Sequence, residues 1–363
     1  MRIESLNLAN FRCYESFSLE LPAGLSVFQG PNASGKTSLL EAIMLLVTGR
    51  SPRTNWSREM IRWGTQQAQV QGVFVRRDER RDEVQVTLSL SDRAEVEKAS
   101  LLNGAAPDSV AQLLQRLPVV IFEPEDLQLV KGGSSERRRF MNLALSGLRP
   151  LYLDDLLRYR RALRQRNELL KQTWRGRASG EDLAPWTAQL VRTGAQLMAD
   201  REWLLQQLAP RAGLLYAELS GDAEQLELTY RPRVEAEEGG LPERMQAFYE
   251  ALEETEEMDL RRGATQVGPH RDELVVRLGG QRARDFGSQG QQRTAALSLK
   301  LAQAQLLAAG REESPLVLLD DCLSELDDDR QRHVLELVGQ FDQILLTTAA
   351  EPPVRAEGHV VRL

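Results

Sequence analysis

The stretch Gly30-Pro31-Asn32-Ala33-Ser34-Gly35-Lys36-Thr37 fits the pattern G-x-x-x-x-G-K-[ST], in which x is any residue. Residues 25–29 before it form a short apolar run, which is typical of a core strand. Residues 39–47 after it are apolar on nearly all sides, which is typical of a buried helix. A phosphate-binding loop requires this context of an entering strand and a leaving helix. The sequence therefore predicts such a loop.

The chemistry expected of this loop follows from its residue types. Glycines let backbone amides curl around an anion, and the amino-terminal end of the helix adds partial positive charge. We expect Lys36 to reach the β- and γ-phosphates of ATP and Thr37 to offer its hydroxyl to Mg²⁺. An ordinary glycine turn that opens a helix is the alternative. The predicted nucleotide contacts in this loop are Gly30, Pro31, Asn32, Ala33, Ser34, Gly35, Lys36, Thr37 and Ser38.

Two carboxylates follow a second apolar strand near the carboxyl end of the chain. Residues 316–319 are Leu-Val-Leu-Leu, and Asp320 and Asp321 come directly after them. We predict that Asp320 holds Mg²⁺ with Thr37, directly or through water. Asp321 is expected to polarise the attacking water, and it is the predicted catalytic residue together with Lys36. Capping of the following helix is the alternative role of this acidic pair.

A third segment, Ser288-Gln289-Gly290-Gln291-Gln292-Arg293, opens a helix predicted over residues 291–309. A serine and a glycine at the amino-terminal end of a helix can bind an anion, although they also serve as a plain helix cap. Residues 324–327, Ser-Glu-Leu-Asp, follow the acidic pair within a helix predicted over residues 323–338. Alone, each of these segments indicates only the start of a helix.

The predicted elements divide the chain into three parts. Residues 1–124 begin as strand-strand-strand-loop-helix, and further strands are predicted over residues 69–76 and 84–90. Residues 125–261 are mainly helical and predict an antiparallel arm that turns at residues 176–180, with legs of roughly 30 residues that reach about 45 Å. The strand and helix pattern returns over residues 262–363. We therefore expect an α/β domain that is split by a helical insertion.

Composition and charge exclude several classes of protein. The 363 residues contain no apolar run long enough for a membrane span, and the two cysteines exclude a disulfide scaffold. With no secretory signal recognisable, we expect a cytoplasmic protein without a membrane partner. Residues 131–177 contain 13 basic and 4 acidic residues, whereas residues 218–259 contain 3 basic and 14 acidic residues. The basic stretch favours contact with DNA, and we expect the acidic stretch to point away from it.

The four motifs in this order resemble the head of ABC-type ATPases, specifically of the SMC-like group. Further segments resemble the RecF family of bacterial recombination mediators, and the resemblance covers essentially the whole chain. It implies an α/β fold, namely an ABC-type P-loop ATPase head split by a helical insertion. The segments that carry it are Asn10-Phe11-Arg12, residues 122–127 (Phe-Glu-Pro-Glu-Asp-Leu), Lys131-Gly132, residues 137–140 (Arg-Arg-Arg-Phe) and residues 268–272 (Gly-Pro-His-Arg-Asp).

The resemblance also implies an activity. Ser288, Gly290 and Gln291 of one subunit would contact the γ-phosphate bound to the other, so two chains would form an ATP-dependent homodimer around ATP and Mg²⁺. The family binds gapped DNA, single-stranded/double-stranded junctions or duplex DNA, and works with RecR and RecO to load RecA in recombinational repair. It implies a weak, DNA-stimulated ATPase whose slow hydrolysis times release and does not drive a motor.

Two positions depart from the pattern of the ABC group. The glutamine that contacts magnesium in the group has no counterpart in residues 120–127, where Glu123 or Glu125 could take its place. After the last core strand, where transporters use a histidine, this chain has Thr347 and Thr348. A threonine cannot act as a base, so we expect it only to orient the γ-phosphate or water.

Two other functions compete with this interpretation. The first is a transporter-type ATPase subunit that acts on a protein or membrane partner without DNA. The helical insertion comes too late in the chain for the usual transporter arrangement, and its basic residues suit DNA better. The second is a nucleotide-binding scaffold that does not hydrolyse ATP. The Asp320-Asp321 pair argues against it.

Several basic residues have two possible roles. The triplet at residues 137–139 suits either the interior of the fold or contact with DNA. Arg160, Arg164 and Lys171 share roughly one face of a helix, which is either a DNA-binding or a solvated face.

Three aromatic residues are also ambiguous. We expect His270, in a Gly-Pro turn, to be structural or to contact DNA or a partner subunit, and not to be catalytic. Trp56 and Trp63 are expected to anchor their segment on the sheet, with base stacking as the alternative.

Overall fold

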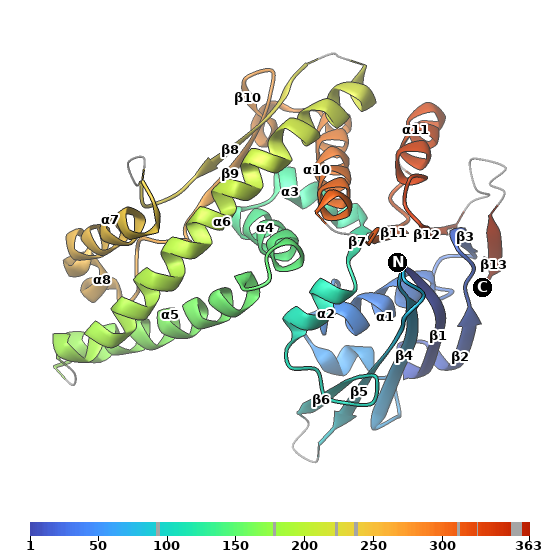
Figure 1. The fold of residues 1–363 in the computed structure, drawn as a ribbon, viewed down its shortest axis with the longest axis horizontal. Helices are drawn as coiled ribbons and strands as arrows, with labels where there is room; N and C mark the ends of the chain where they lie inside the picture. Colours follow the sequence, from blue (N-terminus) through green and yellow to red (C-terminus); the bar gives the residue numbers. More distant parts are fainter. Residues whose placement is uncertain are drawn as a thin grey trace. The chain divides into compact units, whose positions relative to one another are not determined.

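The chain forms two compact units in the computed structural model. The structure describes residues 1–91, 95–176, 179–221, 224–235, 239–310, 313–324, 326–349 and 358–363. Unit 1 comprises Met1–Asp126 and Leu297–Leu363, and unit 2 comprises Leu127–Ala296. Figure 1 shows the strands and helices of both units.

Unit 1 contains an antiparallel sheet of five strands. These strands are β1 (Arg2–Phe11), β2 (Tyr14–Glu20), β4 (Gln67–Val75), β5 (Arg81–Leu90) and β6 (Val96–Leu102), paired in the order β2-β1-β4-β5-β6. In β5, Val84, Val86 and Leu88 are buried and the residues between them are more exposed. This alternation confirms the strands predicted over residues 69–76 and 84–90.

The second sheet of unit 1 is parallel and provides the edge where the site forms. Its strands are β3 (Gly24–Gln29), β7 (Val119–Phe122), β11 (Leu316–Asp320), β12 (Gln343–Thr348) and β13 (His359–Arg362), in the order β13-β3-β12-β11-β7. Because all neighbours pair in parallel, their carboxyl ends meet at one edge. Ligands bind at this edge in open α/β sheets.

The helix α1 (Lys36–Thr48) contacts strands of both sheets. All its residues except Thr37 and Thr48 are buried, as the apolar sequence predicted. The short helix α2 (Val110–Arg116) packs against it. The helix expected over residues 323–338 is shorter, because α11 (Asp328–Val338) starts only after Asp327, whose side chain accepts from the Arg330 amide. Residues 321–324 therefore form a turn that follows β11, and Glu325 lies outside the described residues.

The expectation that Trp56 and Trp63 anchor their segment is wrong. Their side chains are 75% and 91% exposed. Other residues hold the segment around the short 3₁₀ helix Ser57–Met60: Met60 and the following Ile61 are 3% and 2% exposed, and polar contacts add to this packing. Arg12 Nη1 donates to the Glu59 carbonyl at 2.7 Å, and Ser51 Oγ donates to the buried Glu41 carboxylate. These anchors leave the two indole rings in solvent.

Unit 2 is built around a helical hairpin, as the sequence predicted. After α3 (Gln128–Lys131) and α4 (Ser134–Leu148), α5 (Tyr152–Trp174) and α6 (Gly180–Ser220) pack against each other. Leucines 190, 197 and 204 are fully buried along α6. The legs are unequal, with 23 residues in α5 and 41 in α6. Among the described residues, no helix is both long and apolar enough to cross a membrane.

A small sheet completes unit 2. Its strands β8 (Leu226–Arg231), β9 (Glu273–Leu278) and β10 (Gln281–Arg282) pair antiparallel, and α7 (Leu241–Glu254), α8 (Glu256–Arg262) and α9 (Ala283–Phe286) lie beside them in the chain. The sequence predicts that residues 262–296 belong to the ATPase head, but they lie in unit 2. The pairing of β9 with β8 is the reason. The helix α10 (Gln289–Ala309) has residues in both units.

A network of buried polar groups fixes residues 268–272 in unit 2. Arg201 Nη1 donates to the Pro269 carbonyl at 2.6 Å and to the Asp272 carboxylate at 2.9 Å. The Tyr230 hydroxyl also donates to Asp272. The side chains of Arg201 and Asp272, which form this ion pair, are 2% and 0% exposed. The structural role that the sequence left open for His270 therefore extends to the whole Gly-Pro-His-Arg-Asp segment.

His270 is held in this segment as a neutral imidazole. Its Nε2 lies 3.0 Å from the Thr265 carbonyl, and its Nδ1 lies 2.6 Å from the Tyr159 hydroxyl. These partners assign the proton to Nε2, so that Nδ1 accepts from Tyr159. Burial, reinforced by the charge of Arg271 and other arginines, lowers the pKa of His270 to about 4.

We expect His270 to make the protein less stable in acid. Its pKa falls on folding from 6.5 to about 4. The neutral imidazole therefore contributes fully to the free energy of unfolding above pH 6.5, and this contribution is lost as the pH falls towards 4. At pH 5 the loss is about 2 kcal/mol. Urea unfolding of His270→Gln should show a pH dependence that is smaller by this amount. The exposed His359→Gln control should behave like the wild type, and an unchanged pH dependence in His270→Gln would contradict the assignment.

Candidate nucleotide-binding site

The predicted phosphate loop connects β3 to α1 at the carboxyl edge of the parallel sheet. Lys36, the first residue of α1, is 7% exposed, and its Nζ donates to the Gly30 and Pro31 carbonyls at 2.7 and 2.8 Å. Ala33 and Gly35 have positive φ angles of 68° and 102°. The ammonium group thus lies inside the curl of the loop, next to the amino-terminal end of α1.

Two glycines of the loop are required for steric reasons. A Cβ on Gly30 would lie 2.7 Å from the Leu363 carbonyl oxygen, and a Cβ on Gly35 would lie 2.6 Å from the Tyr14 hydroxyl. Real Cβ atoms essentially never make contacts this short. The loop therefore has no room for side chains at these two positions.

We expect Gly35→Ala to disrupt nucleotide binding far more than a matched glycine change. Gly24 also has a positive φ, of 81°, but nothing lies within 4 Å of a Cβ there. Both variants suffer the left-handed strain of about 1–2 kcal/mol. Only Gly35→Ala also displaces the loop, so its ATP affinity should fall more than about tenfold, as expected for a lost charge-assisted hydrogen bond. Equal ATP affinities in the two variants, measured by calorimetric titration, would refute this explanation.

Asp320 lies at the end of β11, between the phosphate loop and β12. Its Oδ1 accepts from the hydroxyls of Thr37 at 2.9 Å and Thr347 at 2.7 Å. Burial raises the pKa of Asp320, although these two hydrogen bonds oppose the shift. Asp321 follows with a positive φ of 47°, and its amide donates to the Thr347 hydroxyl at 3.0 Å. The structure thus brings Lys36, Thr37, Asp320 and Asp321 to one edge of the sheet.

Glu123 is placed beside this group by strand register. Phe122 at the end of β7 pairs with Leu319, so the next residue, Glu123, is level with Asp320. Burial raises the pKa of Glu123 to about 7; the charge of Lys300 opposes the shift, and Asp126 and Asp320 add to it. Glu125, the other candidate for the missing glutamine, is exposed and outside the strand. The register, which the sequence did not reveal, favours Glu123.

The threonines after the last core strand can also be distinguished. Thr347 is 1% exposed and donates to Asp320. This contact orients a carboxylate, whereas the role expected of Thr347 or Thr348 was to orient the γ-phosphate or water. Thr348 ends β12 and is 8% exposed.

The Asn10-Phe11-Arg12 segment braces the helix of the phosphate loop. Arg12 forms a bidentate ion pair with Glu41 of α1, whose side chain is fully buried. Ser51 also donates to this carboxylate, and Arg53 lies 3.7 Å from it. A bidentate arginine pair holds a planar geometry. The motif therefore fixes α1, and through it the position of the phosphate loop.

The Ser288 segment lies in unit 2, at the start of α10. Ser288 Oγ accepts from the Gln291 amide at 3.3 Å, and Gln291 Oε1 accepts from the Ser288 amide at 2.6 Å. This reciprocal arrangement is a helix cap, the alternative that the sequence left open. Ser288 and Gly290 are exposed, as is 70% of the neighbouring Phe286. The segment is thus available for contact with another molecule.

The residues of unit 1 fit a nucleotide with Mg²⁺. Ser34 Oγ is buried in the loop and has no hydrogen-bond partner in the described part of the chain. The first amide groups of α1 have no acceptor within the helix and can bind phosphate oxygens. The Thr37 hydroxyl and the Asp320 carboxylate are hard oxygen ligands, which Mg²⁺ prefers alongside phosphates.

Comparison with known proteins identifies the family of this fold. Residues 2–363 match the family described as RecF/RecN/SMC N terminal domain. A relative from Natranaerobius thermophilus, named DNA replication and repair protein RecF, is 36% identical over the whole chain and 96% of its own length. The chain belongs to the RecF family.

Solved structures agree with membership of the RecF family. One described as the recombination mediator protein RecF-ATP in the RecFOR pathway has a TM-score of 0.90 and 32% identity, covering 97% of this chain and 93% of its own. The SMC head domain from Pyrococcus furiosus has a TM-score of 0.55 at 14% identity, covering 97% and 90%, and supports the fold alone. The ABC-type ATPase head predicted from the sequence is confirmed.

Proposed function

We propose that this chain is an ATP-dependent DNA-binding protein of recombinational DNA repair. The proposal rests on one observation: this chain, a member of the RecF family, places Lys36, Thr37 and Asp320 at one edge of a parallel sheet. This arrangement suits a nucleotide with a divalent cation. The resemblance to a structure described as RecF-ATP supports ATP as the nucleotide.

The roles proposed for the residues of unit 1 follow from their contacts. Lys36 exchanges its two backbone carbonyl acceptors for phosphate oxygens of ATP. Thr37 and Asp320, already joined by a hydrogen bond, hold Mg²⁺. Asp321, directly after β11, accepts a proton from the attacking water. When bound, ATP with Mg²⁺ supplies a phosphoanhydride bond whose slow hydrolysis times release from DNA.

The proposal includes an ATP-dependent homodimer. Ser288, Gly290 and Gln291 of one chain complete the nucleotide site of the other. The exposure of Ser288 and Gly290 at the amino-terminal end of a 21-residue helix supports this role, because such an end attracts phosphate. Exposed Phe286 beside them supplies an apolar contact for a partner surface.

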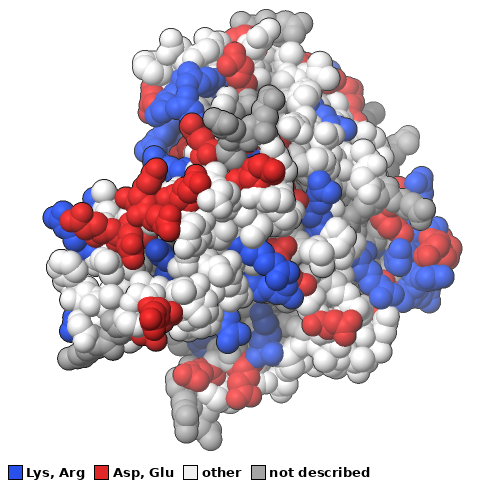
Figure 2. All heavy atoms as spheres, turned by 60° about the vertical axis from the view of Figure 1, so that its left-hand side comes forward, with Lys and Arg blue, Asp and Glu red and all other residues white. Residues whose placement is uncertain are grey.

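DNA in gapped, junction or duplex form is the proposed ligand, with RecR and RecO as partners in loading RecA. Exposed Arg160, Arg164 and Lys171 along α5 provide positive charge in unit 2. Figure 2 shows acidic side chains gathered on the left of the face drawn, with basic groups beside them and further basic groups elsewhere on the same face. Exposed basic groups attract the phosphates of a polyanion such as DNA. The proposed ATPase activity is weak, is stimulated by DNA and takes place in the cytoplasm.

The test is fluorescence anisotropy of a labelled gapped duplex titrated with the protein, with and without ATP and Mg²⁺. Binding that strengthens with ATP and weakens steeply with salt is the expected result. Absence of binding in both states would remove the DNA proposal. It would favour the alternative of an ATPase that acts on a protein or membrane partner.

We expect Asp321→Asn to bind ATP normally and to accumulate as a dimer. The amide keeps the size of the carboxylate but cannot accept a proton, so hydrolysis should fall by about 10²-fold or more. Size-exclusion chromatography with light scattering, in ATP and Mg²⁺, should show the dimer. Asp328→Asn, at an exposed position of the same acidic segment, is the matched control. A monomeric Asp321→Asn protein with ATP bound would contradict the proposal that a second chain completes the nucleotide site.

A further inference from the structure

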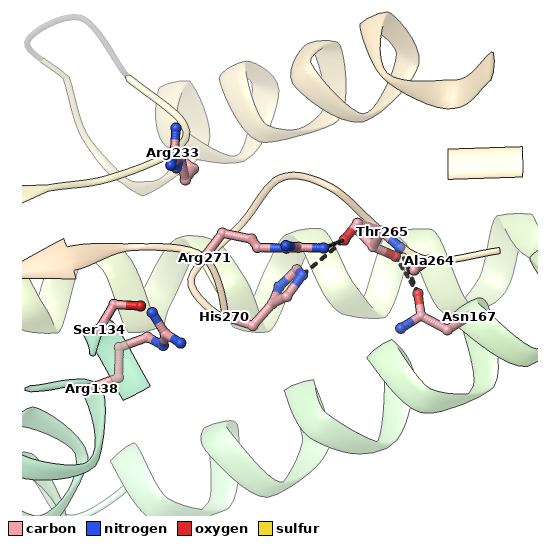
Figure 3. Close-up of a pocket in the computed structure, with 8 residues that line it drawn as sticks. All are labelled: Ser134, Arg138, Asn167, Arg233, Ala264, Thr265, His270 and Arg271. Atoms are coloured by element: carbon pink, nitrogen blue, oxygen red, sulfur yellow. Dashed lines mark hydrogen bonds between the residues drawn. The ribbon is translucent and has the colours of Figure 1, made fainter. Parts of the chain in front are cut away.

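A basic cavity lies in unit 2. Its volume is about 380 Å³, and it is lined by residues of α4, of α5 and of the segments around residues 233 and 264–271. Figure 3 shows Arg138, Arg233 and Arg271, which reach it from three different parts of the chain. Among the described residues, no aspartate or glutamate lines it.

The three arginines of the cavity have no ion-pair partner among the residues that the structure describes. In the described part of the chain, none of their guanidinium groups lies within 4.0 Å of a carboxylate, the limit for an ion pair. Other arginines of unit 2 are neutralised: the buried Arg137, Arg166 and Arg201 pair with Glu273, Asp259 and Asp272. The unit therefore neutralises the arginines of its interior and leaves those of the cavity free to bind an anion.

The charge of Arg138 is partly removed from solvent at the cavity. Burial lowers the pKa of Arg138, and the positive charge of Arg201 lowers it further. The carboxylates of Glu273 and Asp272 oppose this shift. An anion beside Arg138 would relieve the repulsion between the cations.

The frame of the cavity is rigid, whereas its donors stay available. Arg138 Nη1 donates to the Asp272 carbonyl at 2.8 Å, and the Arg233 amide donates to the Asp272 carboxylate at 2.9 Å. In the part of the chain that the structure describes, Arg271 Nη2 donates to the Thr265 carbonyl and to the Gln266 amide oxygen, both at 3.5 Å. Hydrogen bonds of this length are weak. Most guanidinium donors at the cavity can therefore turn to a ligand.

The amino-terminal end of α4 adds to this set of donors. Ser134 is the first residue of this 15-residue helix, and it lines the cavity. No side chain caps the helix at Gly133. Its first amide groups carry partial positive charge and lack acceptors within the helix.

We propose that this cavity is a phosphate-binding site that takes a phosphodiester group of the DNA backbone. The inference rests on the DNA binding proposed above. Guanidinium groups match phosphate oxygens in bidentate geometry, and three of them converge here from separate elements. The side chains of Arg233 and Arg271 are exposed, so a phosphate that remains part of a strand can reach them.

The test uses the double variant Arg233→Gln/Arg271→Gln in the full chain. We expect its affinity for labelled gapped duplex, with ATP and Mg²⁺, to fall about tenfold or more. The slope of log affinity against log salt should become shallower by about one for each phosphate that the variant no longer neutralises. Arg161→Gln, an exposed arginine of α5 that does not line the cavity, is the control, with a change of less than about twofold expected. The single variants Arg233→Gln and Arg271→Gln are measured in the same way, and thermal unfolding of each variant checks that its fold is intact.

A second arm uses inorganic phosphate at constant ionic strength. Phosphate should raise the Tm of the wild type more than that of the double variant, in which the phosphate loop is unchanged. Stabilisation by phosphate with unaltered DNA binding would overturn the DNA backbone as the ligand. Equal DNA affinity in both proteins and no difference in phosphate stabilisation would overturn the site altogether. A wild type that binds no DNA would instead reject the function on which the inference rests, and the phosphate arm would still report on the cavity.

Discussion

Lys36→Ala should lose ATP binding almost completely. Among the described residues, the Lys36 ammonium group has two hydrogen-bond acceptors, the backbone carbonyls of Gly30 and Pro31 in the phosphate loop. A hydrogen bond from a charged donor contributes about 1.5–3 kcal/mol, and Lys36 is placed to make two with phosphates. The loss of both corresponds to a fall in affinity of roughly 10²–10⁴-fold. Calorimetric titration with ATP and Mg²⁺ measures this directly.

Lys98 offers a matched control at the opposite end of the same helix. Its Nζ donates to the carbonyl of Gly49, the C-cap of α1. Lys98→Ala therefore also removes a lysine that bonds to backbone next to α1, but far along the helix from the loop. Its ATP affinity should change by less than about threefold. If Lys36→Ala binds ATP as well as Lys98→Ala does, the loop is not the nucleotide site.

Arg201→Met should strongly destabilise unit 2. The substitution keeps much of the side-chain volume but leaves the fully buried Asp272 carboxylate without its cation. Breaking a buried pair by removing one partner costs about 3–5 kcal/mol. Urea unfolding followed by circular dichroism should show a loss of this size. Asp272→Asn in the Arg201→Met background should recover part of it, because no unpaired charge then remains buried.

Arg244→Met is the control for this prediction. Arg244 also forms a bidentate ion pair, with Glu202 at 2.8 and 2.7 Å, but the Glu202 side chain is 37% exposed. Pairs open to solvent contribute about 0–1 kcal/mol. Similar losses in Arg201→Met and Arg244→Met would show that the buried network does not fix residues 268–272.

The elements of the nucleotide site were predictable because each carries its own local signal. The phosphate loop, the strand before Asp320 and the helix after Ser288 all occur close to where the pattern of apolar residues placed them. Contacts between distant residues were not predictable in this way. Glu123 reaches Asp320 only through the register of β7 with β11, and Thr347 does so only through the pairing of β11 with β12.

The arginine triplet at residues 137–139 also shows that the sequence does not predict long-range contacts, here within a single turn of helix. Arg137 is buried and pairs with Glu273, while Arg138 faces the cavity and Arg139 is exposed. Three adjacent identical residues have no local feature that separates an internal role from a surface role. Successive residues of a helix point about 100° apart, so the packing of α4 assigns each one a different environment.

The sequence by itself determined the class of fold and the identity of the phosphate loop, because both depend on residue types at short spacing. Glycines, a lysine and a threonine within eight positions define the loop wherever the chain folds. The tertiary structure alone decided which charges are neutralised and which stay available. Ion pairs such as Arg201–Asp272 join residues 71 positions apart, and only the packed chain brings them together. The arginines left over by that pairing define the basic cavity.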